Sequence, residues 1–177
     1  MKNSGFYILL GVMLVSSWAH AKGMYYDTKS VLKDFFKDSE RVTYQELHTT
    51  DISEKFVQRL GYTPAKSKYI IFTAYTQNHL DGYAVIDEEL GQHLPITLAC
   101  QISPDGVVVR TEVMVYREGY GGEIREKRFQ EQFTGTDANH LPQFGRNVVA
   151  VTGATISSRS MVTAIQRAVI LVDLLRK

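Results

Sequence analysis

Between residues 28 and 60, apolar side chains recur at the spacing of amphipathic helices. The pattern predicts two helices here, with a short strand at residues 42–47 between them. Asp51 or Ser53 is expected to cap the second helix, because a short polar side chain can accept from its first amides. Gly61 is expected to end it, since glycine adopts the left-handed conformation of a C-cap without strain.

Farther along, the pattern changes to short runs of aromatic and β-branched residues, which are typical of strands. Turn residues separate the runs, Asp81–Gly82 between the first two and Ser103–Gly106 before the last. Neighbouring strands joined by hairpins pair antiparallel, so the sequence predicts an antiparallel sheet. Its strands are expected at residues 69–76, 83–86, 95–102 and 107–116.

The last third of the chain alternates loops with apolar segments. A glycine-rich loop at residues 118–123 precedes a short helix at 126–133, and a polar loop at 135–147 precedes a buried strand at 148–151. A final helix is expected to start near Ser157 or Ser158, with Val162, Ile165, Val169 and Val172 on one stripe. The predicted fold class is α+β, with N-terminal helices, an antiparallel sheet and a C-terminal helix.

The first residues form a separate pattern. Lys2 precedes an apolar run at residues 6–18, and Ala19-His20-Ala21 follows it. A short positive start, an apolar run and an A-x-A end are typical of a secretory signal peptide. We expect cleavage between Ala21 and Lys22 and a periplasmic or other extracytoplasmic protein; an uncleaved, membrane-associated anchor is the alternative. The predicted parts are a signal peptide at 1–21, a helical segment at 22–68 and a second domain at 69–177.

Composition excludes several classes. The formal net charge is +1 and no basic stripe is present, which argues against a nucleic-acid partner. Cys100 is the single cysteine, so an intramolecular disulfide is impossible, and its apolar surroundings predict burial. The histidines outside the leader show no metal-ligand spacing, and no metal is expected.

A hydroxyl-rich turn lies directly before the predicted last helix. A helix start offers unpaired amides and the positive end of a dipole, both of which favour an anion such as phosphate. Taken alone, the stretch has two interpretations of about equal weight. It is either a phosphate site or a helix start with more capping residues than the helix needs. The candidate ligands are Thr152, Gly153, Ala154, Thr155, Ser157, Ser158 and Arg159.

Two motifs in the same order resemble the FMN-binding domain family. One is Thr152-Gly153-Ala154-Thr155 with serines behind it, and the other is the strand, glycine-rich loop and aromatic helix at residues 111–135. The resemblance covers roughly residues 82–174. The family includes the covalently flavinylated subunits of sodium-pumping quinone reductase and Rnf complexes and related secreted proteins. It therefore implies FMN as the cofactor.

The resemblance also implies a mode of attachment. In covalently modified members the last hydroxyl residue of the turn, here Thr155, carries FMN through a phosphoester that an FMN transferase makes from FAD. The family pattern has an acidic residue six positions earlier, where this chain has Val149. Because the transferase is expected to read that acid, covalent and non-covalent FMN both remain open.

The rest of the cofactor site is expected in the glycine-rich loop. Glycines allow the backbone to approach a ligand closely, and an aromatic ring can stack on a flavin. The candidate residues are Glu118, Gly119, Tyr120, Gly121 and Gly122.

Three functions follow as hypotheses. The first is a secreted electron carrier with membrane or periplasmic redox partners, which needs no general base and is not a stand-alone enzyme. The second is a flavin-free binding or assembly module that keeps the fold. The third is a hydrolase with Thr155 or Ser158 as nucleophile and His93 or His140 as base, although no local motif supports it.

Overall fold

The computed structural model describes residues 7–8, 23–63 and 65–177. The predicted signal peptide and its cleavage site therefore lie outside the described residues, apart from Tyr7 and Ile8. Within the described ranges, no helix has both the length and the hydropathy needed to cross a membrane.

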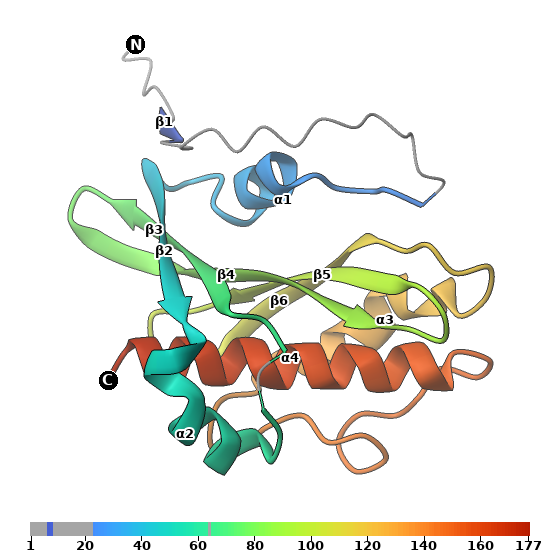
Figure 1. The fold of residues 1–177 in the computed structure, drawn as a ribbon. Coiled ribbons are helices and arrows are strands. Elements are labelled where there is room, and N and C mark those ends of the chain that lie inside the picture. Colours follow the sequence, from blue (N-terminus) through green and yellow to red (C-terminus); the bar gives the residue numbers. More distant parts are fainter. Residues whose placement is uncertain (1–6, 9–22, 64) are drawn as a thin grey trace.

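A six-stranded sheet forms the centre of the fold, with its strands in sequence order (Figure 1). The first pair is parallel and every following pair is antiparallel. The strands are β1 (Tyr7–Ile8), β2 (Arg41–His48), β3 (Lys68–Thr76), β4 (His79–Leu90), β5 (Pro95–Ile102) and β6 (Val108–Val115).

Helices cover both faces of the sheet (Figure 1). One face carries α1, and the other carries α4 with α2 beside it. The helical elements are α1 (Thr28–Phe35), α2 (Thr49–Leu60), the 3-10 turn η1 (Gly122–Arg125), α3 (Lys127–Gln130), the 3-10 turn η2 (Glu131–Phe133) and α4 (Thr155–Leu175). The α+β prediction is confirmed.

Neighbouring residues of a strand point to opposite faces, so the sheet separates two cores. Under α1 the sheet presents Ala74, Ala84 and Ala99 together with the larger Met114. The α4 face presents Ile71 and Val85 among others and holds the larger core. Cys100 is buried on this second face, as predicted.

The N-terminal helical segment is built into the sheet. Its strand β2 pairs with β3 along the whole of its length, and α2 packs against α4. The capping prediction for α2 is wrong, since this helix begins at Thr49, but Gly61 ends it in the left-handed conformation with φ of 76°. The boundary at residue 68 remains a prediction.

The predicted turn at Asp81–Gly82 is also wrong. β3 and β4 turn at Gln77, whose φ is 56°, and β4 continues through Gly82. The register of the pair shifts between Ala74 and Tyr75, close to this glycine. A Cβ on Gly82 would lie 2.7 Å from the carbonyl oxygen of Ile102, so the glycine serves close strand approach and not a turn.

Two predictions near the C-terminus need correction. Residues 148–151 do not form a strand; Val148 is buried but makes one isolated bridge, to Phe144. The side-chain amide of Gln132 pairs with the backbone of Val149 instead: its nitrogen donates to the carbonyl oxygen of Val149, and its oxygen accepts from the N–H of Val149. The last helix begins at Thr155, two residues before Ser157, because Gly153 turns the chain first with φ of 81°.

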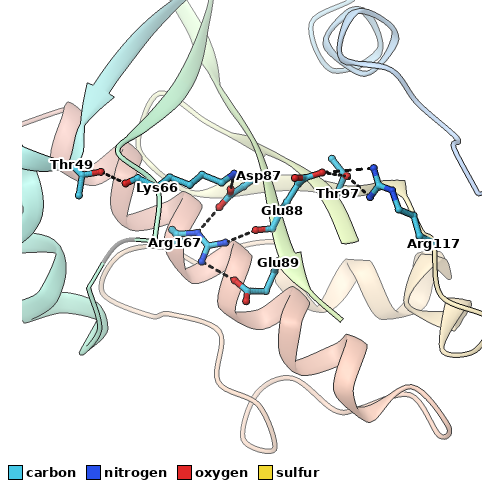
Figure 2. A network of polar contacts seen from close by, with 8 residues as sticks. All are labelled: Thr49, Lys66, Asp87, Glu88, Glu89, Thr97, Arg117 and Arg167. Atoms are coloured by element: carbon cyan, nitrogen blue, oxygen red, sulfur yellow. Dashed lines mark hydrogen bonds and ion pairs between the residues drawn. The ribbon is translucent and has the colours of Figure 1, made fainter. Parts of the chain in front are cut away.

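A buried ion pair fixes α4 against β4 (Figure 2). The guanidinium of Arg167 donates to Asp87, to Glu89 at 2.8 Å and to the carbonyl oxygen of Glu88 at 3.1 Å. Lys66 reaches the other oxygen of Asp87 at 2.5 Å. Burial acts to lower the pKa of Arg167, but the carboxylates outweigh it and hold this pKa above its ordinary value.

This network predicts a large effect of Asp87→Asn. The substitution leaves the Arg167 charge buried with one carboxylate fewer, and we expect unfolding free energy to fall by about 3 kcal/mol. Urea denaturation followed by circular dichroism measures it. Lys127→Ala is the control, since its pair with Glu131 is exposed at 3.7 Å and its loss is expected to cost less than about 0.5 kcal/mol. An equal loss of unfolding free energy in both variants would contradict a stabilising role of the buried Arg167–Asp87 pair.

Candidate FMN site

Three segments meet at one end of the sheet: the start of α4, the β4–β5 turn and the glycine-rich loop after β6 (Figure 1). The hydroxyl of Ser160 donates to the carbonyl oxygen of Leu90 at 2.6 Å, which joins α4 to the end of β4. The carboxylate of Glu118 accepts from the amides of His93 at 2.6 Å and Leu94 at 2.9 Å. Each segment is therefore held by one of the others.

The turn before α4 leaves the helix start open. The amide of Ala154 donates to the carbonyl oxygen of Val151 at 3.0 Å, and Gly153 supplies the left-handed residue. Ala154 then occupies the N-cap position, and no side chain of the described residues caps the helix. The first amides of α4 are thus available to an anion, and the helix dipole adds a favourable field.

The hydroxyls of this region divide into two groups. Ser157 and Ser158 are buried: the first hydroxyl lies 2.9 Å from that of Tyr116, and the second donates to the carbonyl oxygen of Ala154 at 2.8 Å. Thr152 and Thr155 are exposed, and neither hydroxyl has a hydrogen-bond partner among the described residues. The serines therefore hold the turn in shape, whereas Thr155 faces solvent at the helix start.

The glycine-rich loop packs directly on this helix start. Gly121 is buried, with φ of 84°, and a Cβ there would lie 2.7 Å from the hydroxyl oxygen of Tyr116 and 2.9 Å from that of Ser157. Tyr120, next to it, is 90% exposed. A side chain at position 121 would push the loop away from α4, so the site requires glycine here.

Tyr116 is a site residue that the sequence did not reveal. Its hydroxyl donates to the carbonyl oxygen of Tyr120 and contacts Ser157, so one side chain joins the loop to α4. Burial raises the pKa of the phenol above its ordinary value, which keeps the proton that it donates. In the sequence Tyr116 reads as the last residue of a strand, and only the packing of α4 brings it to Ser157.

Two pockets adjoin at Tyr120 and Gly121. The smaller, of about 210 Å³, is lined by the start of α4, including Thr155, and by Gln92 of the β4–β5 turn. The other, of about 570 Å³, is lined by residues 119–123 with Arg125 and Glu126. The structure thus brings the turn and the loop, which lie far apart in the sequence, to the walls of two adjoining pockets.

Other predicted residues lie at the edge of this arrangement. The carboxylate of Glu118 accepts hydrogen bonds from the backbone amides of His93 and Leu94 in the β4–β5 turn, and these hydrogen bonds lower its pKa. Arg159 is exposed, with its guanidinium 4.0 Å from the centre of the Phe144 ring. Gly119 and Gly122 belong to the loop, and only Gly122 approaches the Tyr116 ring.

The geometry does not support a hydrolase. Ser158 is fully buried, and its hydroxyl donates to a backbone carbonyl. His140 contacts Asp137, and His93 is engaged through its amide in the β4–β5 turn. Neither histidine ring has a hydrogen bond to Thr155 or Ser158 within the described part of the chain, where no metal-ligand cluster is found either.

Comparisons with known proteins concern the family and the fold. Residues 91–170 match the model of the FMN-binding domain family, and this range contains every site residue predicted from the sequence. The resemblance to that family is thereby confirmed. A crystal structure of Shewanella oneidensis NqrC is similar in fold, with a TM-score of 0.53 and 16% identity over 78% of this chain and 82% of that chain. No curated protein matches.

Gly121→Ala tests the packing of the loop on α4. A left-handed alanine costs about 1–2 kcal/mol, and the contacts with Tyr116 and Ser157 add to this cost. We expect thermal unfolding to occur several degrees lower.

The matched control is Gly119→Ala, because a Cβ there meets nothing within 4 Å. We expect it to change unfolding free energy by less than about 0.5 kcal/mol. If both variants unfolded at the wild-type temperature, the loop would not be docked as described.

Proposed function

We propose that this protein, whose residues 91–170 match the FMN-binding domain family, is an extracytoplasmic flavoprotein that carries electrons between redox partners. One observation carries the proposal. Inside the matched range, an exposed threonine hydroxyl lies at the uncapped start of a long helix, in a pocket beside a glycine-rich loop. This arrangement suits the phosphate end of FMN.

The residues present fit the group by their chemistry. Amides of the first turn of α4, with the hydroxyl of Thr155, are the donors for the phosphate. The hollow lined by residues 119–123 gives room beyond it, and Tyr120 offers an exposed ring there. Bound FMN would supply transfer of one or two electrons, and the protein would supply binding, orientation and tuning of the potential. No side chain of the site needs to act as a general base.

Covalent attachment at Thr155 is the finer part of the proposal. An FMN transferase would form the bond between the threonine oxygen and the FMN phosphorus of FAD, while the bond to AMP breaks and AMP leaves. Thr155 is exposed and its hydroxyl has no hydrogen-bond partner among the described residues, so this hydroxyl is accessible to such an enzyme. By contrast, Ser157 and Ser158 are buried and unsuitable as acceptors.

The location and partners rest on the sequence. The N-terminal pattern of a signal peptide supports export, and a covalent tether would keep the flavin outside the cytoplasm, where little free cofactor is present to rebind. The family resemblance supports a membrane redox complex or a periplasmic protein as donor and acceptor. The alternative, a flavin-free assembly module, is distinguished by the absence of colour.

Thr155→Ala tests the attachment. The full chain is expressed with its N-terminal leader and an FMN transferase, and the intact mass is measured after denaturation. We expect wild type to gain the mass of FMN less one water and Thr155→Ala to lose this gain.

Thr152→Ala is the matched control, because Thr152 is also an exposed hydroxyl of the turn and should retain the modification. A yellow native protein with an unmodified mass would replace the covalent form by bound FMN. A colourless wild-type protein would overturn the proposed function in favour of the flavin-free module.

Val149→Asp tests whether an acidic residue at position 149 controls how efficiently FMN is attached to Thr155. Val149 is 70% exposed, so an acidic side chain is expected to be tolerated without loss of stability. If the transferase reads an acid at this position, the modified fraction rises in Val149→Asp and stays at the wild-type level in Val149→Asn. Quantitative mass spectrometry after a short induction measures the fractions. Equal fractions in all three proteins would contradict the role of the acid.

A further inference from the structure

We propose that residues 23–26, an irregular segment with one isolated bridge to β6 that is here called the N-terminal strand, hold the candidate FMN site in its binding shape. The strand lies directly after the predicted cleavage site and, in Figure 1, extends from α1 toward the end of the sheet that carries the glycine-rich loop. The expected effect on FMN binding rests on the proposed function. The coupling itself can be measured without cofactor.

Backbone hydrogen bonds attach this strand to the end of β6. The amide of Tyr116 donates to the carbonyl oxygen of Gly23 at 2.9 Å, and Met24 forms an antiparallel bridge with Val115. The amides of Tyr25 and Tyr26 donate to the carbonyl oxygen of Met114 at 2.8 and 3.2 Å. The strand therefore pairs with β6 at its last residues, immediately before the loop begins.

Gly23 is the residue that permits this pairing. Its φ is 103°, and a Cβ at this position would lie 1.9 Å from the carbonyl oxygen of Tyr116. The clash is with backbone, so rotation of a side chain cannot relieve it. A substitution here must displace either the N-terminal strand or the backbone of Tyr116.

Tyr116 connects the strand to the site. Its backbone pairs with Gly23, while its hydroxyl joins Ser157 of α4 to the carbonyl oxygen of Tyr120. A shift of the Tyr116 backbone therefore changes the packing of the loop on the helix start. Gly23 is not among the residues that line either pocket and acts through Tyr116, which makes it a positioning residue.

A second contact ties the strand to the segment after the loop. The guanidinium of Arg125, at the end of η1, lies 3.3 Å from the centre of the Tyr25 ring. Such a cation–π contact adds a side-chain attachment to the backbone hydrogen bonds. The strand thus contacts the chain both before and after residues 117–122 and fixes both ends of the loop.

The side chains of the N-terminal strand bury little apolar surface. Met24 is 55% exposed and Tyr25 is 39% exposed, and among these side chains only the partly buried Tyr26 packs against the core, so backbone hydrogen bonds are the main attachment. An edge segment of this kind opens at lower free energy than the core of the sheet. Its release should loosen the site and leave β3, β4 and β5 paired.

The experiment compares Gly23→Ala with Met24→Ala in the full chain, after intact mass has shown the same N-terminus for both. Met24→Ala is the control, because its side chain is mostly exposed and its backbone pairing is kept. Amide hydrogen exchange is measured without cofactor. We expect Gly23→Ala to raise exchange at Tyr116, Ala154 and Ser158, whose amides donate backbone hydrogen bonds, and not in β3 and β4.

FMN titration of the same samples, made without a transferase, gives the functional readout through flavin fluorescence. Because the loop and the helix start would no longer be held in the binding shape before FMN arrives, FMN binding is expected to weaken by about tenfold in Gly23→Ala and not in Met24→Ala. A synthetic peptide of residues 22–27 should restore binding to Gly23→Ala, and the peptide carrying the same substitution should not.

Unchanged exchange at Ala154 and Ser158 would overturn the inference. So would increased exchange throughout the sheet, because the strand would then stabilise the fold as a whole and not the site. If exchange changes as expected but wild type shows no flavin quenching, the positional coupling stands and non-covalent FMN binding fails. Wild-type quenching with equal affinities in both variants would leave the site independent of the strand and would also overturn the inference.

Discussion

The burial of α4 is the constraint on which the rest of the structure depends. This helix packs on the sheet with one side, and α2 and the loop of residues 134–154 cover other sides. Its residues from Met161 to Val172 are mostly buried. A helix in this position cannot leave a charge unpaired. Arg167 therefore requires Asp87 and Glu89 of β4, and this requirement fixes both the rotation and the axial position of the helix.

Fixing α4 also fixes its first turn. Arg167 lies twelve residues after Thr155, about three helical turns away. Once the arginine is paired, Ser160 reaches the end of β4 and Ser157 meets Tyr116. The turn with its exposed threonine is thereby presented to the glycine-rich loop. Packing energy in the core thus determines the position of a polar site at the edge of the fold.

The hydroxyls at the helix start illustrate how similar residues take different roles. Ser157, Ser158 and Ser160 are satisfied inside the protein, where an unpaired hydroxyl would cost free energy. Thr152 and Thr155 stay outside. The sequence shows a row of hydroxyls without distinguishing them, since period and spacing alone do not reveal which side of the helix start faces Tyr116.

The sequence by itself determined the α+β class, strands β3, β5 and β6, the Ser103–Gly106 turn, the burial of Cys100 and the motif at residues 152–155. These follow from local periodicity and turn chemistry, which act over a few residues. Tertiary structure decided the extent of β4 through Gly82, the role of Tyr116 and the attachment of residues 23–26 to β6. Each depends on a contact between segments distant in the chain, and a strand edge or a hydroxyl selects such a partner only after the core has packed.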